Sequence, residues 1–444
     1  LLVGLSPTPN SVAIPERYVP LAVVSNSSSL GAAFNANSQL IALPAGELTV
    51  NARVTAETQH LSSAEGSAPF QSFHQSRAMA HAGAEIPIIG PDLPVVGFLG
   101  SLSMSLNGDW EWVSHGERLP SYNYALEWQP KGFITVSLSR SRTRNAPILA
   151  RTNDPVIFSP GVLVADLVSG EYALVTRISG GTPDLLATRE SESTVHLTLN
   201  GAVGSTNGSA SIEYSSVETA NPVILTAYPS LLFQSLFPDR FARDANGRLT
   251  GIDTRPFNTL SERRKVLRSN LHMSGLLRHS GGEEIDKGGV NWDLSITHEW
   301  TLRDVMKPGA AASSIDLLKT PLDAVQGAPR HRLNLEASTT YRQMTARFGA
   351  RWRSGAVVED LSASEGTSIR YAAFWTADAE VCWTFRSIQN TDSVNGWRLF
   401  LSIENILNKR LSVHDSSGRT PLAFQPAFID PVGRSVIIRI IHTL

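Results

Sequence analysis

Residues 332–353 read Arg-Leu-Asn-Leu-Glu-Ala-Ser-Thr-Thr-Tyr-Arg-Gln-Met-Thr-Ala-Arg-Phe-Gly-Ala-Arg-Trp-Arg, and this stretch decides the fold. Apolar and polar side chains alternate through 333–341 and again through 344–352. A period of two is typical of a β-strand with one apolar face. Only Arg342 and Gln343 separate the two runs, so the sequence predicts a two-residue β-hairpin.

The same alternation recurs along most of the chain and predicts an all-β protein. A second hairpin is expected at residues 130–132, where Pro, Lys and Gly favour a turn. One or two weaker strands are expected within residues 18–42, and no helical period separates the runs. The fourteen predicted strands are 48–57, 71–81, 97–106, 122–129, 133–140, 194–200, 208–214, 266–277, 292–302, 332–341, 344–353, 373–385, 397–407 and 434–444.

The composition excludes several classes of protein. The 444 residues carry a formal net charge of -2, so no basic excess is present to neutralise nucleic-acid phosphates. The single cysteine, Cys382, rules out a disulfide within the chain and a thiolate metal cage. No run of about eighteen apolar residues is present, so no transmembrane helix is predicted. A β-barrel would escape that test, because it exposes apolar side chains to lipid only at every second position.

Alternation alone fits a soluble β-sandwich as well as a barrel, and strand length and tryptophan spacing favour the barrel. Several predicted strands have ten or more residues, whereas a tilted membrane strand needs about 9–11. Trp292 and Trp300 share one face, as do Trp375 and Trp383, each pair eight residues apart. At about 3.3 Å per residue and a tilt of about 40°, that spacing spans roughly 20 Å of height, close to the distance between aromatic girdles. The alternative is that each pair consists of two large core residues.

The lengths of the connections point to the same architecture. From residue 122 onward, short and long connections strictly alternate, as expected for periplasmic turns and extracellular loops. The short connections are 130–132, 201–207, 278–291, 342–343 and 386–396. The long connections are 142–193, 215–265, 303–332, 354–372 and 408–433.

The second faces of the strands carry charged and polar residues, which a water-filled lumen tolerates. We therefore expect these side chains to face the interior of a barrel. They are Asp293, Glu299, Asp378, Glu380, Arg398, Ser402 and Glu404.

Several motifs occur in a characteristic order. Residues 397–410 contain Glu-Asn-Ile-Leu-Asn-Lys-Arg, residues 424–431 follow as a loop, and Gly-Arg at 433–434 opens the last predicted strand. Together they resemble the end of TonB-dependent receptors of the outer membrane. Further segments similar to that family are 170–171, 178–185 (Ile-Ser-Gly-Gly-Thr-Pro-Asp-Leu), 329–335 and 351–355.

The resemblance implies a transmembrane antiparallel β-barrel over residues 45–444, preceded by a segment of weak strands or barrel lead-in at 1–44. Members of the family carry a plug domain and a TonB-contacting box ahead of a barrel of about 22 strands. Neither plug nor box is recognised in this sequence, which matches the C-terminal barrel portion. The chain also ends on Leu444 rather than on an aromatic residue.

In function, the resemblance implies an uptake receptor of the Gram-negative outer membrane, not an enzyme and without a cofactor. Its ligand would be a scarce nutrient such as a siderophore, metal complex, cobalamin or carbohydrate, with energy from the TonB complex if the full protein has a plug. The expected partners are outer-membrane lipid and a small ligand, with no nucleic acid, and the expected state is a monomer. The alternatives are a passive porin-like channel and, third, an enzyme on a β scaffold.

No residue is nominated for catalysis or metal binding, and the substrate-binding residues stay unassigned. Residues 244–253 resemble a calcium loop faintly, but the glycine position and the missing glutamate favour an ordinary turn. His272 is expected in the lumen and His298 on the apolar face. Cys382 is expected on the lumen face and inert.

Overall fold

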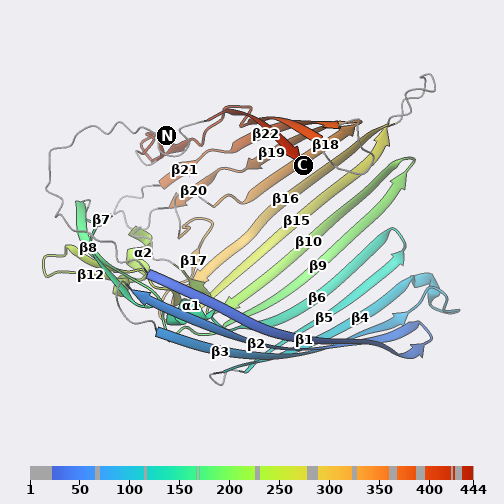
Figure 1. Ribbon diagram of the computed structural model, residues 1–444, viewed down its shortest axis with the longest axis horizontal. Helices are drawn as coiled ribbons and strands as arrows, with labels where there is room; N and C mark the ends of the chain where they lie inside the picture. The colour runs from blue at the N-terminus through green and yellow to red at the C-terminus, as the bar shows by residue number, and fades with distance from the viewer. Residues whose placement is uncertain are drawn as a thin grey trace.

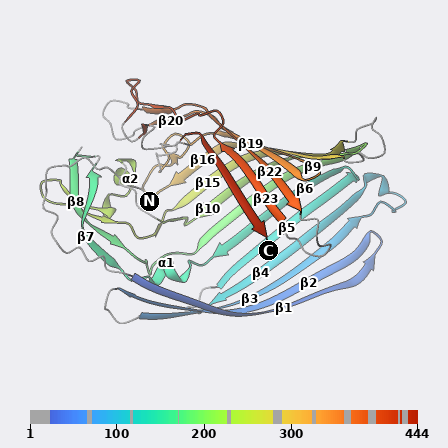
Figure 2. The ribbon, with the colours of Figure 1, turned by 45° about the horizontal axis from the view of Figure 1, so that its top comes forward.

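One curved antiparallel sheet dominates the computed structural model (Figures 1 and 2), and fifteen of its sixteen strands follow one another in chain order. These strands are β1 (Val23–Leu43), β2 (Gly46–Glu65), β3 (Gln71–Ile89), β4 (Ser101–Val113), β5 (Arg118–Lys131), β6 (Ile134–Asn145), β9 (Thr188–Val203), β10 (Thr206–Ala220), β15 (Ser261–Leu277), β16 (Val290–Lys307), β18 (His331–Tyr341), β19 (Met344–Arg353), β22 (Phe374–Arg386), β23 (Gly396–Glu404) and β25 (Ser435–Thr443). The described residues are 23–65, 71–114, 118–166, 168–169, 171–225, 231–277, 289–322, 328–359, 368–386, 396–421, 424–425 and 433–443.

All fourteen predicted strands are confirmed as members of this sheet. β1 accounts for the weaker strand expected within residues 18–42, of which 18–22 lie outside the described residues. Several boundaries were wrong. The strand predicted from residue 97 begins at Ser101, because Gly97–Leu99 form a short 3-10 helix. The strand predicted to end at residue 407 ends at Glu404, and β3 continues to Ile89, beyond the predicted end at residue 81.

The two predicted hairpins form. In the hairpin of β18 and β19, Tyr341 pairs with Met344, and Arg342 at the turn has a φ of 54°. In the other hairpin β5 continues to Lys131, so the turn lies at residues 132–133 rather than at the predicted 130–132. A bulge between Trp128 and Lys131 carries the strand past Pro130. A bulge is where a strand tolerates proline, which has no N–H to donate to the ladder.

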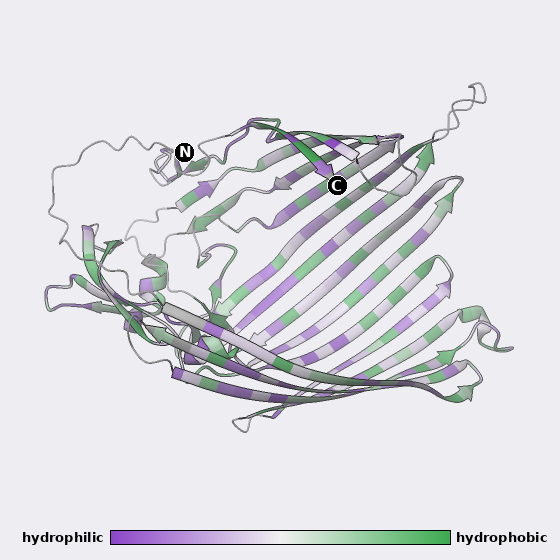
Figure 3. Cartoon of the chain, viewed as in Figure 1, coloured by the Kyte–Doolittle hydropathy of each residue, from purple (hydrophilic) through white to green (hydrophobic). Residues whose placement is uncertain are grey.

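Hydrophobic and hydrophilic residues alternate along many strands of the sheet (Figure 3). Because successive side chains point to opposite faces, the sheet has an apolar outer face and a polar lumen face. All nine tryptophans belong to the outer face, which follows from the register of each strand pair. They gather at the two ends of the strands, as in the girdles of a membrane barrel, so the girdle interpretation is supported over the core interpretation. Five tryptophans lie toward the end of the sheet from which the long connections leave: Trp110, Trp112, Trp300, Trp352 and Trp375. Four lie toward the opposite end: Trp128, Trp292, Trp383 and Trp397.

The predicted alternation of connection lengths is confirmed from β5 onward. All long connections leave the same end of the sheet, whereas turns such as 204–205 and 342–343 lie at the other end. Residues 278–288 and 387–395 of two predicted short connections lie outside the described residues. The long connections are 146–187, 221–260, 308–330, 354–373 and 405–434.

The motif after β23 ends that strand and attaches it to its neighbours. Asn405 and Asn408 have φ values of 49° and 48°, a left-handed conformation that asparagine tolerates better than most residues. The Asn405 N–H donates to Asp378 Oδ1 at 2.8 Å, and the Arg434 N–H donates to Asn408 Oδ1 at 3.2 Å. Asn405 therefore connects the end of β23 to β22, and Asn408 connects it to the residue that precedes β25. Residues 426–431 of the loop predicted there lie outside the described residues.

β1 and β25 are the two edges of the sheet within the described part of the chain. Every neighbouring pair on the path is antiparallel, and the path holds an odd number of strands. The two edge strands therefore run in the same direction and cannot pair with each other in the antiparallel manner of all the other seams.

Among the described residues, no helix has the length and apolar character needed to cross a bilayer.

The long connections contain further short helices and strands. The elements in the connections are α1 (Leu149–Asn153), α2 (Leu231–Leu236), η2 (Pro238–Arg240), β7 (Ile157–Asp166), β8 (Glu171–Ser179), β11 (Val223–Ile224), β12 (Phe241–Arg243), β13 (Leu249–Asp253), β14 (Phe257–Asn258), β17 (Ile315–Asp316), β20 (Ala356–Glu359), β21 (Ser368–Tyr371) and β24 (Val413–His414).

Substitution of Ala379 tests the outer face. Ala379 lies midway along β22 and pairs with Phe348 and Ile403 on the outer face. We expect Ala379→Arg to cost about 2–4 kcal/mol, because it places a charge near the bilayer midplane. Ala379→Leu should be neutral or slightly stabilising, since lipid leaves room for a larger apolar side chain. Unfolding in detergent or lipid measures both. A cost of about 1–3 kcal/mol for Ala379→Leu, as in a close-packed core, would contradict a lipid-facing surface.

Candidate functional site: the lumen wall and the external loop module

Ion pairs between neighbouring strands line the lumen face. In β19, Arg347 bonds to Glu380 at 3.2 Å and Arg351 pairs with Asp378, both partners being in β22. Ser402 of β23 donates to the second oxygen of Glu380 at 2.9 Å. The predicted lumen positions of these carboxylates and of the serine are confirmed.

A second group of charges centres on Glu299 of β16. Its carboxylate accepts from Arg264 at 3.4 Å, Arg268 at 3.1 Å and Arg332 at 3.4 Å, on both neighbouring strands. Arg268 also bonds to Glu213 of β10 at 3.2 Å. In the described part of the chain, the lumen wall thus carries a network of paired charges that suits contact with water or a polar solute.

A groove of about 580 Å³ runs along this wall between β16 and β22. Its charged lining is mixed in sign, so it does not select for either anions or cations. Its charged and polar side chains are Asp293, Asn334, Glu336, Ser338, Arg347, Arg351 and Asp378.

The singled-out histidines and the cysteine lie where the period predicted. His272 faces the lumen and lies 3.3 Å from Asp293. His298 is on the outer face, stacked on His331 with ring centroids 5.4 Å apart. Cys382, half-buried on the lumen face, is the one cysteine of the chain. Within the described part of the chain, no three His, Cys, Asp or Glu side chains are grouped as a metal site requires.

Two long connections, 146–187 and 221–260, fold together into what we call the external loop module. Its sheet has the order β12-β13-β8-β7, and β13 pairs with β8 in parallel although they come from different connections. The Thr182 hydroxyl donates to the Pro256 carbonyl at 2.7 Å and Thr254 donates to Ile178 O at 2.8 Å. Figure 1 shows the module at the end of the sheet from which the long connections leave.

The module has a hydrophobic core of its own. Phe233 of α2 is fully buried and contacts the rings of Phe237, Phe241 and Phe257. The Arg240 guanidinium lies 4.2 Å from the ring centroid of Phe257. The rest of the buried core consists of Ala173, Val175, Leu249 and Ile252.

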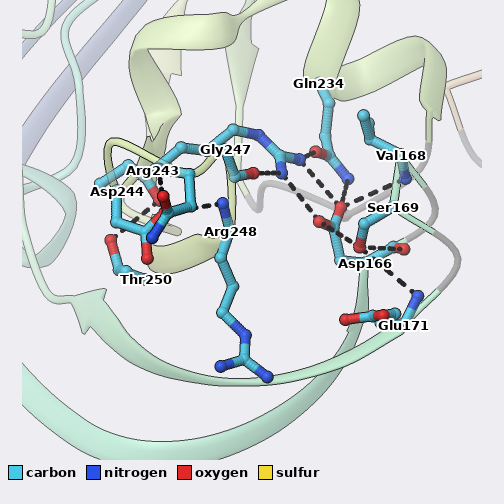
Figure 4. A network of polar contacts seen from close by, with 12 residues as sticks. Asp166, Val168, Ser169, Glu171, Gln234, Arg243, Asp244, Gly247, Arg248 and Thr250 are labelled. Carbon is cyan, nitrogen blue, oxygen red and sulfur yellow. Dashed lines mark hydrogen bonds and ion pairs between the residues drawn. The ribbon is translucent and has the colours of Figure 1, made fainter.

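A buried carboxylate joins the two connections (Figure 4). Asp166, at the end of β7, is only 1% exposed, and both of its oxygens accept from Arg243 at 2.8 Å. Ser169 Oγ donates to Asp166 at 2.9 Å, and the Val168 N–H donates at 3.2 Å. Gln234 bonds to both Arg243 and Asp166. The carboxylate is therefore paired as a buried charge must be.

Hydrogen bonds from Arg243 hold the pKa of the Asp166 carboxyl well below its usual range, although burial opposes them. Burial would also raise the pKa of Asp253, but hydrogen bonds from Arg255 and the charge of Arg240 more than offset it, so that pKa is lowered. Both carboxylates are structural anions of the module.

The segment that resembles a calcium loop is a turn. Asp244 Oδ1 accepts from the backbone N–H of Asn246 and of Arg248, both at 2.9 Å, which closes the β12–β13 hairpin. The positive φ of Gly247, 79°, completes it. The interpretation as an ordinary turn is confirmed.

The outer side of the β7–β8 hairpin exposes large apolar side chains. Leu163 and Leu174 pair across the hairpin and are 63% and 69% exposed. Tyr172 and Phe158 on the same two strands are 71% and 58% exposed. Contiguous exposed apolar groups mark binding surfaces more often than scattered ones do, so this hairpin is the candidate capture surface of the module.

The sequence predicts neither the module nor this surface, because residues 142–193 lack the alternation of period two and are expected to form a loop. One signal was present: residues 162–164 and 172–175 are short apolar runs. Short continuous apolar runs next to glycine are consistent with strands that are apolar on both faces. The pairing of the two connections left no comparable local signal.

Comparison with known proteins places the fold. No family model matches the sequence, and no curated protein matches it. Solved structures do match, at 11–14% identity in the three cited next. The siderophore receptor PirA of Acinetobacter baumannii aligns with a TM-score of 0.53, at 11% identity, over 94% of this chain and 55% of that one. PirA of Pseudomonas aeruginosa aligns with 0.50, at 12%, over 95% and 57%. The ferric enterobactin receptor PfeA of Pseudomonas aeruginosa aligns with 0.52, at 14%, over 87% and 50%.

The chain therefore has the fold of a TonB-dependent receptor β-barrel, as its motifs predicted. It spans about half the length of the solved structures that it matches. The matched proteins are transport receptors.

Removing the Asp166 charge should loosen the external loop module. We expect Asp166→Asn to cost the module about 1.5–3 kcal/mol, because Arg243 loses a charge-assisted partner. The protection of the backbone amides of residues 241–253 against hydrogen exchange measures this loss of stability. Asp239→Asn is the control, since Asp239 is an exposed carboxylate of the same module.

Acidification supplies a second measurement. A lowered carboxyl pKa contributes stability that is present above its unfolded value of about 4 and is lost as the pH falls toward the folded value. Protection of residues 241–253 should fall over that window in the wild type and change less in Asp166→Asn. Identical pH profiles for the two proteins would show that the carboxylate does not hold the module.

Proposed function

We propose that this chain forms the barrel of an outer-membrane receptor for uptake of a scarce nutrient, energised through TonB in the complete protein. The observation that carries the proposal is the two-faced sheet with its one-sided long connections. The outer face has tryptophans at both ends, the lumen face has paired charges, and the long connections form a folded module at one end. The likeness to siderophore receptors supports it at the level of the fold.

For the nutrient, we propose a siderophore or comparable metal complex that is captured by the external loop module. The exposed hairpin residues Leu163, Tyr172 and Leu174 supply an apolar contact surface. The lumen wall below it supplies paired charges, which suit passage of a polar solute. The solved structures with this fold are siderophore and ferric enterobactin receptors, so we propose transport and not catalysis.

Epitope tags inserted in the two kinds of connection would show which end of the barrel faces outside the cell. A short epitope inserted at Asp244–Gly247, the turn of the external loop module, should be labelled on intact cells. The same epitope at Arg342–Gln343 should be labelled only after the outer membrane is opened, because short turns face the periplasm. Labelling of the second site on intact cells, with none at the first, would contradict the orientation.

Nutrient uptake by whole bacteria tests the proposed receptor activity. Bacteria that depend on the full-length protein should take up one of ferric enterobactin, cyanocobalamin or a metal complex in a saturable, TonB-dependent way. The double variant Leu163→Ser, Leu174→Ser should weaken its binding about a hundredfold or more, since each of the two lost apolar contacts is worth about 1.5 kcal/mol or more and about 1.4 kcal/mol is a factor of ten. Val95→Ser is the control, because Val95 is 80% exposed but lies in the short connection 90–100. Non-saturable flux that ignores TonB would instead indicate a passive pore.

A further inference from the structure

One continuous row of outer-face residues crosses the five strands β6, β9, β10, β15 and β16. On the side of the long connections, this row is the limit of the apolar outer surface of these strands. Leu138 pairs with Val195, Val195 with Tyr214, Tyr214 with Leu267, and Leu267 with Trp300. Below this row the outer positions are mainly apolar. Above it, toward the long connections, their chemistry changes abruptly.

The next three rows contain eight basic side chains, which we call the basic outer belt. Among the belt's described contacts, its one carboxylate neighbour on this face is Glu218, 2.7 Å from Arg263. The belt consists of Arg140, Arg142, Arg144, Arg189, Arg263, Lys265, Arg303 and Lys307.

The belt is specific to the outer face. The lumen face of the same strands carries acids, including Glu190 and Glu192 of β9, Glu213 of β10 and Glu299 of β16, and its arginines Arg264 and Arg268 are paired with them. Because successive residues point to opposite sides of a strand, these carboxylates point away from the belt. The basic charge therefore accumulates on the side that meets lipid.

The strongest accumulation lies where β6 meets β9. Arg144 is directly opposite Arg189, with Arg142 two residues below on the same face. Like charges placed opposite each other destabilise a sheet. Arg189 Nε is moreover buried without a hydrogen-bond partner. An anion at this point would relieve the repulsion and accept the unpaired N–H.

Aromatic side chains fix the level of the belt in a membrane. Tyr122 and Tyr124 of β5 pair with Arg142 and Arg140, and their rings stack with centroids 6.4 Å apart. Tyrosine is enriched where hydrocarbon meets the polar headgroups. The anions at that level are the phosphates of lipid headgroups, which the arginine fork binds with two parallel hydrogen bonds.

We propose that the basic outer belt binds the phosphate headgroups of an anionic lipid in the outer leaflet, with Arg142, Arg144 and Arg189 as its centre. This goes beyond nutrient uptake and rests on the proposed function only for the membrane placement. Several basic groups at a membrane surface add their attraction to anionic lipid, so the belt would hold a lipid shell at the end of the barrel that carries the long connections.

The test uses the full protein in nanodiscs of phosphatidylcholine with one lipid in five replaced by phosphatidylglycerol. Native mass spectrometry counts the anionic lipids that stay bound after release. Arg144→Gln, Arg189→Gln should weaken their retention about tenfold or more. The charge-matched control is Lys131→Gln, Arg342→Gln at the opposite end of the sheet, which should leave retention at the wild-type level.

Inorganic phosphate separates a lipid site from a free-anion site. Phosphate at ten millimolar should not displace the bound lipid, and displacement would overturn the proposal in favour of a free anion. Equal retention by the belt variant and the control would overturn it as well. A wild-type protein that fails to insert into nanodiscs would instead refute the membrane placement. Heat-dependent gel mobility confirms that each variant is folded. The double variant Arg140→Gln, Arg303→Gln is a second variant of the basic outer belt.

Discussion

A backbone that crosses hydrocarbon must satisfy its own hydrogen bonds, and here the neighbouring strand does so along every seam of the sheet. Each unpaired backbone group would cost several kcal/mol in lipid. Pairing in chain order meets that need with turns as short as two residues, such as 342–343. The remaining features of the fold follow from this ladder, because it fixes which side chains share a face.

The register of the ladder then determines every surface. A shift of one residue in a single strand would exchange its faces, bringing Trp375 and Trp383 into the lumen and Asp378 into lipid. The ion pairs of the lumen wall depend on the same register, since Arg351 and Asp378 meet only across β19 and β22. Apolar contact outside and charge pairing inside therefore stabilise the same alignment.

The large sheet was predictable because its signal is local. Alternation over seven to thirteen residues identified all fourteen predicted strands, and the lumen positions of Asp378, Glu380 and His272 followed from the period alone. The external loop module was not predictable in the same way. Its central pairing joins Gly251 to Thr176, far apart in the chain and in parallel, and β7 and β8 are apolar on both faces. Such strands lack the alternation that identified the others.

The basic outer belt and the external loop module adjoin each other at the end of β6 and the start of β9. Arg144 lies near the end of β6, shortly before α1, and Arg189 lies at the start of β9, shortly after the buried Leu185. The repulsion between these two guanidiniums acts where the connection 146–187 leaves and rejoins the sheet. Within the module, the Asp166–Arg243 pair joins that connection to the next one. Charge thus acts in opposite senses in one connection. The Asp166–Arg243 pair stabilises its outer part, whereas Arg144 and Arg189 repel each other at its base, where Arg189 Nε has no hydrogen-bond partner and the proposed lipid phosphate would be bound.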